Sequence, residues 1–370
     1  MLPELTADVG LVDHHCHGVV VDDLDQERFA ALGTECPWPR AAAKTPFWLA
    51  VRSVCAPVLG LPRHASAEAY VARRGELGGA EASRRLLAAA GLAHLLVETG
   101  VQTPAIASPS AMAGLTGLPA GTVVRLEALA ERIAPHAEPA TLLDDFEKAL
   151  DEELRTAAGV KTVAAYRCGL DLAAAPPADA DVRRAAENWL GEGGGKRLSD
   201  PVLISRFAWA AAERGTVIQA HVGFGDPDID LARVDPSLLM PFLHATRTTG
   251  SRVALLHCYP YVGQAATLAH IFPHVWFDVS CVSHFAGPAA PRILRDALTV
   301  APYDRVLFAS DAYALAEQYL VSAVTWRRGL GRLLGEWVAD DWLTADDARD
   351  VAGLIGAGNA AGLYRLEVAA

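Results

Sequence analysis

Short runs of Val, Ile and Leu alternate along the chain with longer stretches in which apolar residues recur at helical spacing. Continuous apolar runs of this length are typical of strands in parallel sheets, where helices cover both faces. The chain contains eight such runs, and eight strands alternating with helices predict an α/β fold of the (β/α)8 (TIM) barrel type. We expect the strands at residues 10–15, 92–98, 122–127, 160–166, 216–221, 252–257, 275–280 and 305–310.

The connection between the first two expected strands is much longer than a single crossover helix requires. Its residues, about 18–90, show several helical patterns, so we expect a helical insertion after strand one that lies over the barrel mouth. No GxGxxG motif follows the first strand, which argues against a dinucleotide-binding sheet. No linker interrupts the pattern, and residues 1–370 are therefore expected to form a single barrel domain.

Composition and charge narrow the functional class. The 370 residues are 52% hydrophobic and 21% charged, which provides enough apolar material for a large core. The formal net charge is −12 and no Lys/Arg-rich tract occurs, which argues against nucleic acid or a membrane surface as a partner. There is no signal-peptide pattern, no apolar run long enough for a membrane span, and no CxxC among the six cysteines. We therefore expect a cytoplasmic protein with a small-molecule substrate, and homo-oligomerisation is left open.

Residues with metal-binding side chains stand at the C-terminal ends of four expected strands. His15 and His17 are two residues apart, so both imidazoles project from the same face of strand one. His221, His257 and Asp311 end the fifth, sixth and eighth apolar runs. In barrel enzymes this end of the strands carries the active site.

The alternative for each residue is a structural or merely solvated side chain, which is the usual role of a single histidine at a strand end. An isolated HxH pair is also a weak signal. Convergence of four strand ends on one barrel mouth is far more specific. Imidazole and carboxylate ligands together suit zinc, and also manganese, iron or nickel, so the pattern predicts a divalent metal, with one zinc ion as the first choice.

The same motifs carry a family resemblance. The runs VDHHCHG, KTVAAYRCGL, QAHVGFGD, LLHCYPYVGQA and LFASDAY resemble the amidohydrolase superfamily, and within it the second amidohydrolase family. The likeness extends over residues 10–330 and is greatest to the barrel half of FluG-type proteins, in which such a barrel is fused to a glutamine-synthetase-like domain. It implies a metal-dependent hydrolase that cleaves a C–N (amide) bond with a metal-activated water, a γ-glutamyl-type amide being one such substrate.

The resemblance also implies roles for individual residues. His15, His17 and His221 would bind the metal, and Asp311 would be a further ligand or the catalytic base. His257 would be catalytic through a hydrogen bond to the bound water or to the substrate oxygen. Asp13 lies on the same strand face as His15 and either orients the ligands or makes a buried hydrogen bond.

Many amidohydrolases bind two metals through a carboxylated lysine at the end of strand four. In this chain Lys161 is the lysine of that strand, and with Tyr166 or Arg167 at the metal level it would lie about 17 Å deeper. This placement favours one metal over two.

Four residues near the expected strand ends are candidates for substrate binding. The planar guanidinium of Arg167 suits a substrate carboxylate, with a salt bridge inside the protein as the alternative. The other three are Glu98, Glu127 and His284, at the ends of strands two and three and after strand seven.

Two further functions are compatible with the same ligands. A non-oxidative decarboxylase or a sugar-acid isomerase uses a related barrel, and an inactive barrel would serve as a binding or scaffold protein. Ligands alone do not separate the hydrolase from the decarboxylase or isomerase. The intact ligand set argues against the scaffold.

Overall fold

The computed structural model describes residues 5–35, 44–101, 105–193 and 196–367. Its centre is a parallel sheet in which seven strands follow one another in chain order, from β1 to β7. Each strand is hydrogen-bonded to the next along the chain, as in a sheet built from successive strand–helix units. The strands are β1 (Leu11–Cys16), β2 (Leu92–Glu98), β3 (Ala120–Arg125), β4 (Gly159–Thr162), β5 (Val217–Val222), β6 (Arg252–His257) and β7 (Val275–Phe277).

The eighth apolar run is extended and contacts both edges of this curled sheet. Val306 forms a parallel bridge with Phe277, and Leu307 N donates to Phe277 O over 2.9 Å, which joins the run to β7. On its other side, His14 N of β1 donates to Phe308 O over 3.4 Å. Residues 305–310 therefore lie between β7 and β1, although they do not form a regular ladder strand.

Three expected strands end earlier than predicted. The third ends at Arg125, so that Glu127 lies in the first turn of α7 (Leu126–Ile133). The fourth ends at Thr162 and is followed by a 3-10 turn at Ala164–Tyr166. The seventh ends at Phe277 and not at residue 280. These extensions were wrong because buried side chains continue past the last ladder hydrogen bond, and hydrophobicity reports burial, not strand pairing.

Helices follow most of the strands and cover the sheet. Several begin at residues that satisfy free backbone N–H groups, such as Ser108 before α6 and Asp200 before α10, with proline in the first turn. These helices are α6 (Pro109–Thr116), α7, α8 (Leu142–Glu153), α9 (Asp179–Gly193), α10 (Pro201–Glu213), α11 (Met240–Thr246), α12 (Val262–Ile271), α13 (Val282–Ala286), α14 (Ala290–Ala297), α15 (Ala316–Ala339), α16 (Ala345–Gly353) and α17 (Asn359–Tyr364).

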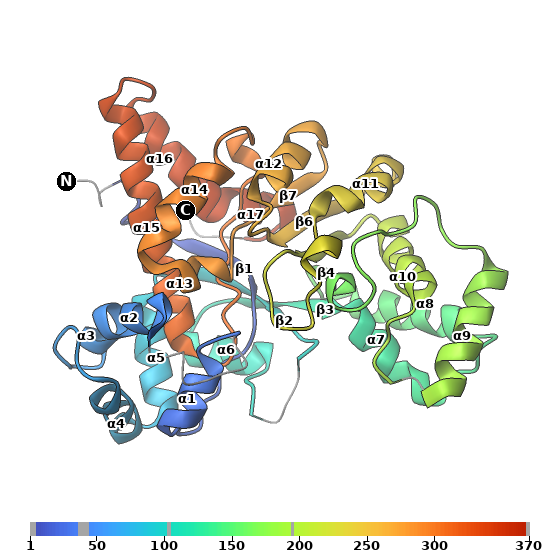
Figure 1. The fold of residues 1–370 in the computed structure, drawn as a ribbon, viewed down its shortest axis with the longest axis horizontal. Helices are drawn as coiled ribbons and strands as arrows, with labels where there is room; N and C mark the ends of the chain where they lie inside the picture. The colour runs from blue at the N-terminus through green and yellow to red at the C-terminus, as the bar shows by residue number, and fades with distance from the viewer. Residues whose placement is uncertain (1–4, 36–43, 102–104, 194–195, 368–370) are drawn as a thin grey trace.

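The described residues of the connection from β1 to β2 include several helices. It forms a group at one end of the view in Figure 1, away from α7 to α10. A buried ion pair joins this group to α15, since Arg74 Nε lies 3.1 Å from Glu317 Oε1. Tyr70 donates to the same carboxylate oxygen over 2.9 Å. The group consists of α1 (Gln26–Leu32), α2 (Pro46–Ala50), a π-helical turn (Val51–Cys55), α3 (Ala56–Val58), α4 (Ala67–Leu77) and α5 (Gly79–Ala89).

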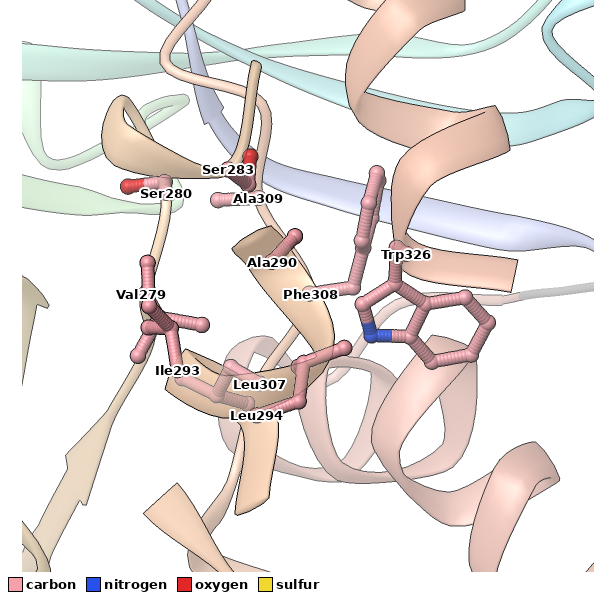
Figure 2. Close-up of a pocket in the computed structure, with 10 residues that line it drawn as sticks. All are labelled: Val279, Ser280, Ser283, Ala290, Ile293, Leu294, Leu307, Phe308, Ala309 and Trp326. Carbon is pink, nitrogen blue, oxygen red and sulfur yellow. The ribbon is translucent and has the colours of Figure 1, made fainter. Parts of the chain in front are cut away.

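Behind residues 305–310 the chain packs an apolar layer, which Figure 2 shows between Val279, Ile293, Phe308 and Trp326. The space left among these side chains is only about 10 Å³. This is about enough for one water molecule, so the layer is packed core and not a ligand site. In the described part of the chain, no helix is both long and apolar enough to cross a membrane.

Candidate metal centre

Three side chains converge at the C-terminal ends of β1, β6 and residues 305–310. His15, His257 and Asp311 each offer a ligand atom, and these atoms lie within 4.8 Å of one another. His15 Nε2 is 3.1 Å from Asp311 Oδ1, and His257 Nδ1 is 3.5 Å from Asp311 Oδ2. His17 belongs to the same cluster, because its Nε2 lies 3.5 Å from Asp311 Oδ1.

His221 completes the group from β5. Its ring centroid lies 4.5 Å from that of His257. The Nε2 atoms of His221 and His257 are buried and have no hydrogen-bond partner among the described residues. Since buried polar atoms are normally paired, two such nitrogens beside a carboxylate fit a bound cation. All five residues named from the sequence are thus brought together, and His257 lies as close to Asp311 as the expected ligand His17 does.

The backbone at two of these positions is unusual. His257 has φ 69° and Asp311 has φ 52°, both in the left-handed region that residues other than glycine rarely adopt. Hydrogen bonds hold each turn, from His257 N to Asp278 Oδ1 (2.8 Å) and from Asp311 N to His15 O (3.0 Å). Strained backbone of this kind is typical of functional sites, where it directs a side chain to a required place.

Burial sets the charge of the cluster. It lowers the pKa of His15 to about 3, with the nearby Lys161 adding to the effect. Burial likewise lowers the pKa of His257 to about 4. Burial alone would raise the pKa of Asp311, but the neighbouring His257 imidazole holds it well below its usual value. Neutral imidazoles beside an ionised carboxylate are the protonation states that metal ligands require.

Glu98 supports His17. Its Oε2 lies 3.2 Å from His17 Nδ1, and Arg125 binds both of its oxygens over 2.8 Å. Burial acts to raise the pKa of Glu98, but the Arg125 charge and His17 together hold it below its usual range. The carboxylate is therefore engaged inside the protein, and its most direct effect is on the orientation of His17.

Lys161 corrects the depth estimated from the sequence. Its Nζ lies 2.9 Å from His15 Nε2, so the side chain reaches the cluster and is not about 17 Å below it. The estimate failed because β4 ends at Thr162, four residues before Tyr166. The position of Lys161 therefore no longer favours one metal over two. Burial lowers the pKa of Lys161, an effect that Asp311 opposes.

The other candidates for substrate binding are placed differently from one another. Arg167 lines the cavity above the cluster, but its Nη1 donates to Glu131 Oε1 over 2.8 Å. Glu127 is buried outside the described cavity lining and accepts hydrogen bonds from the Thr162 hydroxyl and the Val163 N–H. His284 is also buried outside it, beside the Ser322 hydroxyl and the Phe47 ring. The structure brings Arg167 to the cavity and leaves Glu127 and His284 away from it.

Asp13 adopts the buried hydrogen-bonding role that the sequence left open. Its carboxylate accepts from the Ser310 N–H (2.8 Å) and from the Ser310 hydroxyl. This contact fastens the end of residues 305–310 to β1, next to Asp311. Burial raises the pKa of Asp13 to about 7.

The cavity itself has a volume of about 270 Å³ and includes residues that the sequence did not single out. Glu35 comes from the segment after α1 and reaches the cavity lining although its side chain is exposed. Asp226 and Asp228 belong to the loop after β5. No local pattern could have identified Glu35. The lining residues are His17, Glu35, Val101, Arg125, Lys161, Val163, Tyr166, Arg167, Arg197, His221, Asp226, Asp228, His257, Asp311 and Tyr313.

This geometry agrees with the comparison of the whole sequence with known families. A family model described as Amidohydrolase matches residues 12–366. The chain belongs to the amidohydrolase family. The resemblance seen in the strand-end motifs is therefore confirmed, and family membership indicates an enzyme.

Two individual proteins support the same assignment. Protein FluG from Emericella nidulans is 26% identical over 223 residues, a match that covers 56% of this chain and 25% of FluG. The match thus spans about a quarter of the length of that relative. A solved structure from Lactobacillus casei, which bears the name metal-dependent hydrolase, has a TM-score of 0.86 and 27% identity. It covers 98% of this chain and 97% of its own.

A glucuronate isomerase from Caulobacter crescentus has a TM-score of 0.68 at 15% identity, over 100% of this chain and 94% of its own. At this identity the likeness shows a shared fold. The reaction has to be inferred from the site.

Proposed function

We propose that this protein is a metal-dependent hydrolase that cleaves a C–N bond in a small amide. The observation that carries the proposal is the cluster of His15, His257 and Asp311, whose ligand atoms lie within 4.8 Å of one another. His257 and Asp311 also line a cavity of about 270 Å³, a size that suits a small substrate.

His15, His17, His221 and Asp311 would hold the ion, with His257 beside them. Neutral nitrogen ligands and one carboxylate suit zinc, and manganese, iron and nickel are the alternatives. Such an ion, when bound, lowers the pKa of water and polarises a carbonyl group.

Asp311 is the proposed base. Its carboxylate remains ionised at neutral pH because the pKa of Asp311 lies well below its usual value. It accepts a proton from the attacking water and delivers it to the departing nitrogen, so that an amide and one water give a carboxylic acid and an amine. His257 hydrogen-bonds the water or the carbonyl oxygen.

Substrate contacts are proposed for Arg167, which lines the same cavity. Arg167 uses Nη1 to bind Glu131 and the Leu198 carbonyl. A guanidinium carries five N–H donors in all, so a substrate carboxylate can bind to those that remain. The helices between β1 and β2 are proposed to cover the mouth, which is supported by the place of Glu35 in the cavity lining.

The test first measures bound metal and then identifies the product of the reaction. Purified protein is analysed for bound metal and assayed with a panel of small amides, including γ-glutamyl amides, and of carboxylic and uronic acids. Release of ammonia or an amine supports the hydrolase. Release of carbon dioxide, or isomerisation of a uronic acid, would replace it with one of the other reactions. A protein that gains no metal on reconstitution would contradict the hydrolase, the decarboxylase and the isomerase. It would favour an inactive barrel that serves as a binding or scaffold protein.

A further inference from the structure

A chain of buried hydrogen bonds lies behind His15. It begins at Gln219 on β5, whose Oε1 is 2.7 Å from His15 Nδ1. The amide nitrogen of Gln219 donates to the His14 carbonyl and to the Tyr364 hydroxyl, each over 2.8 Å. His14 Nδ1 lies 3.1 Å from that hydroxyl, and His14 Nε2 lies 2.8 Å from Asp278 Oδ2.

The direction of each hydrogen bond follows from its fixed ends. The His14 carbonyl can only accept, so the Gln219 atom facing it is the NH2 group, and Oε1 faces His15. An amide oxygen can only accept as well. His15 Nδ1 therefore carries a proton, and in a neutral imidazole Nε2 is then a free lone pair.

The rest of the chain is equally determined. The Asp278 carboxylate can only accept, so His14 Nε2 donates to it. Nδ1 of the neutral His14 ring is then an acceptor, and the Tyr364 hydroxyl, which accepts from Gln219, donates its own proton to it. In this arrangement every donor has an acceptor, which is the normal condition of buried polar groups.

The neighbours of His15 Nε2 agree with this assignment. Lys161 Nζ, 2.9 Å away, is a donor when it is charged and requires an acceptor. Asp311 Oδ1, 3.1 Å away, faces Nε2 as a second electron-pair donor. Two electron-pair donors side by side are the arrangement that a shared cation satisfies.

We propose that Gln219 and Tyr364 are positioning residues, which hold His15 with its proton on Nδ1 and present the Nε2 lone pair to the cluster. Gln219 acts directly, and Tyr364 acts by fixing the Gln219 amide. The reading of Nε2 as a metal ligand rests on the proposed function. The position of the proton does not.

The same chain reaches the second imidazole of the cluster. Asp278 Oδ1 accepts from the backbone N–H groups of His257 (2.8 Å) and Ser280 (2.7 Å). The Ser280 hydroxyl lies 2.7 Å from His257 Nδ1. His15 and His257 are therefore oriented by one buried network, which the Asp278 carboxylate joins together.

Tyr364 enters this network from the last helix. It ends α17, and the helix is held to the sheet by Arg252 Nη1, which donates to Leu363 O over 2.6 Å. Asn359 Nδ2 adds hydrogen bonds to Tyr303 O and Val306 O, each 2.8 Å. The C-terminal helix thus contributes to the orientation of an imidazole on β1.

The proton position can be measured in the metal-free protein. Nitrogen-15 NMR of labelled histidine distinguishes protonated from free ring nitrogens, and the His15 signals are assigned as those lost in His15→Ala. We expect the His15 proton on Nδ1. A proton on Nε2 in the wild-type protein would overturn the proposal.

Substitution then tests the two residues. Gln219→Met keeps the volume and removes the hydrogen bonds, so His15 loses its single tautomer and metal affinity falls by about 10- to 100-fold in a chelator competition. Tyr364→Phe has a smaller effect, because the His14 carbonyl still holds the Gln219 amide. Wild-type tautomer and affinity in Gln219→Met would overturn the proposal.

A matched control separates positioning from stability. Tyr70→Phe also removes one buried hydroxyl hydrogen bond, of 2.9 Å to Glu317, and should leave metal affinity unchanged. An equal loss of affinity in Tyr70→Phe and Tyr364→Phe would contradict a positioning role for Tyr364. If Gln219→Met does not fold, the wild-type tautomer and Tyr364→Phe decide the matter. A protein with the expected tautomer that binds no metal would contradict the proposed function while supporting the positioning.

Discussion

Two groups of side chains at the cavity differ in the partners of their ionisable atoms. The imidazole cluster (His15, His17, His221 and His257) is buried, and neutral groups such as Gln219 and Ser280 lie within hydrogen-bond distance of its rings. Each of three arginines in the cavity lining (Arg125, Arg167 and Arg197) is paired with a carboxylate of the protein, namely Glu98, Glu131 or Asp228.

The difference indicates what each group can bind. The imidazole cluster has lone pairs and the Asp311 charge facing inward, so it suits a cation. The arginines are already neutralised by internal partners, and a substrate anion must share them. Changes in the imidazole cluster should therefore alter metal content and turnover, whereas changes among the arginines should alter substrate affinity.

The largest expected effect is on metal content. Wild-type protein should hold at least one equivalent of divalent metal, and His15→Ala should hold almost none, because a ligand is removed from the centre of the cluster. Elemental analysis measures both. His136→Ala, an exposed histidine after α7, is the matched control and should retain the metal. Equal metal in all three proteins would remove His15 from the ligand set.

The second largest expected effect is on turnover, when Asp311 is substituted. Asp311→Asn keeps the shape of the side chain and removes the base, so kcat should fall by about 10²-fold or more. The loss of charge also weakens metal binding, and the assay is therefore run with excess metal and accompanied by the thermal midpoint. Near wild-type turnover at saturating metal would mean that Asp311 is not the base, and His257 would be tested in its place.

Substitution of an arginine of the cavity lining should have a smaller effect than the changes above, confined to KM. Arg167→Met should raise KM roughly tenfold, the effect of losing a hydrogen bond to a charged group, with metal content unchanged. Arg206→Met is the control, because Arg206 is also paired with glutamates but lies on α10, outside the cavity lining. Loss of metal from Arg167→Met would show a structural role for this residue.

The smallest expected effect is on the pH dependence of stability. The pKa of Asp13 is raised from 3.8 to about 7 in the folded protein, mainly by burial. Between these values the folded protein binds a proton that the unfolded chain has released, so this contribution to stability is full below about pH 4 and is lost as the pH rises through about 7. The thermal midpoint of metal-free protein should fall more steeply from pH 5 to 7.5 than that of Asp13→Asn. Parallel curves would contradict the raised pKa.

Much of the sheet was predictable because burial leaves a pattern in the chain. The first, second, fifth and sixth strands lie within a residue or two of their apolar runs. The end of β4 was missed, since Val163 and Ala164 are as buried as a strand although no ladder continues through them. That error alone placed Lys161 too deep.

The sequence by itself determined which polar side chains meet at the cluster, because side chains at the ends of parallel strands must meet at one edge of the sheet. Only the tertiary structure decided which groups surround those side chains. Glu35 reaches the cavity from the segment after α1, Lys161 reaches His15 from β4, and Tyr364 reaches Gln219 from α17. These contacts join segments up to 146 positions apart for Lys161 and His15, and 145 for Tyr364 and Gln219. Local periodicity carries no information about such distances, because they are set by how helices and loops pack after the sheet has formed.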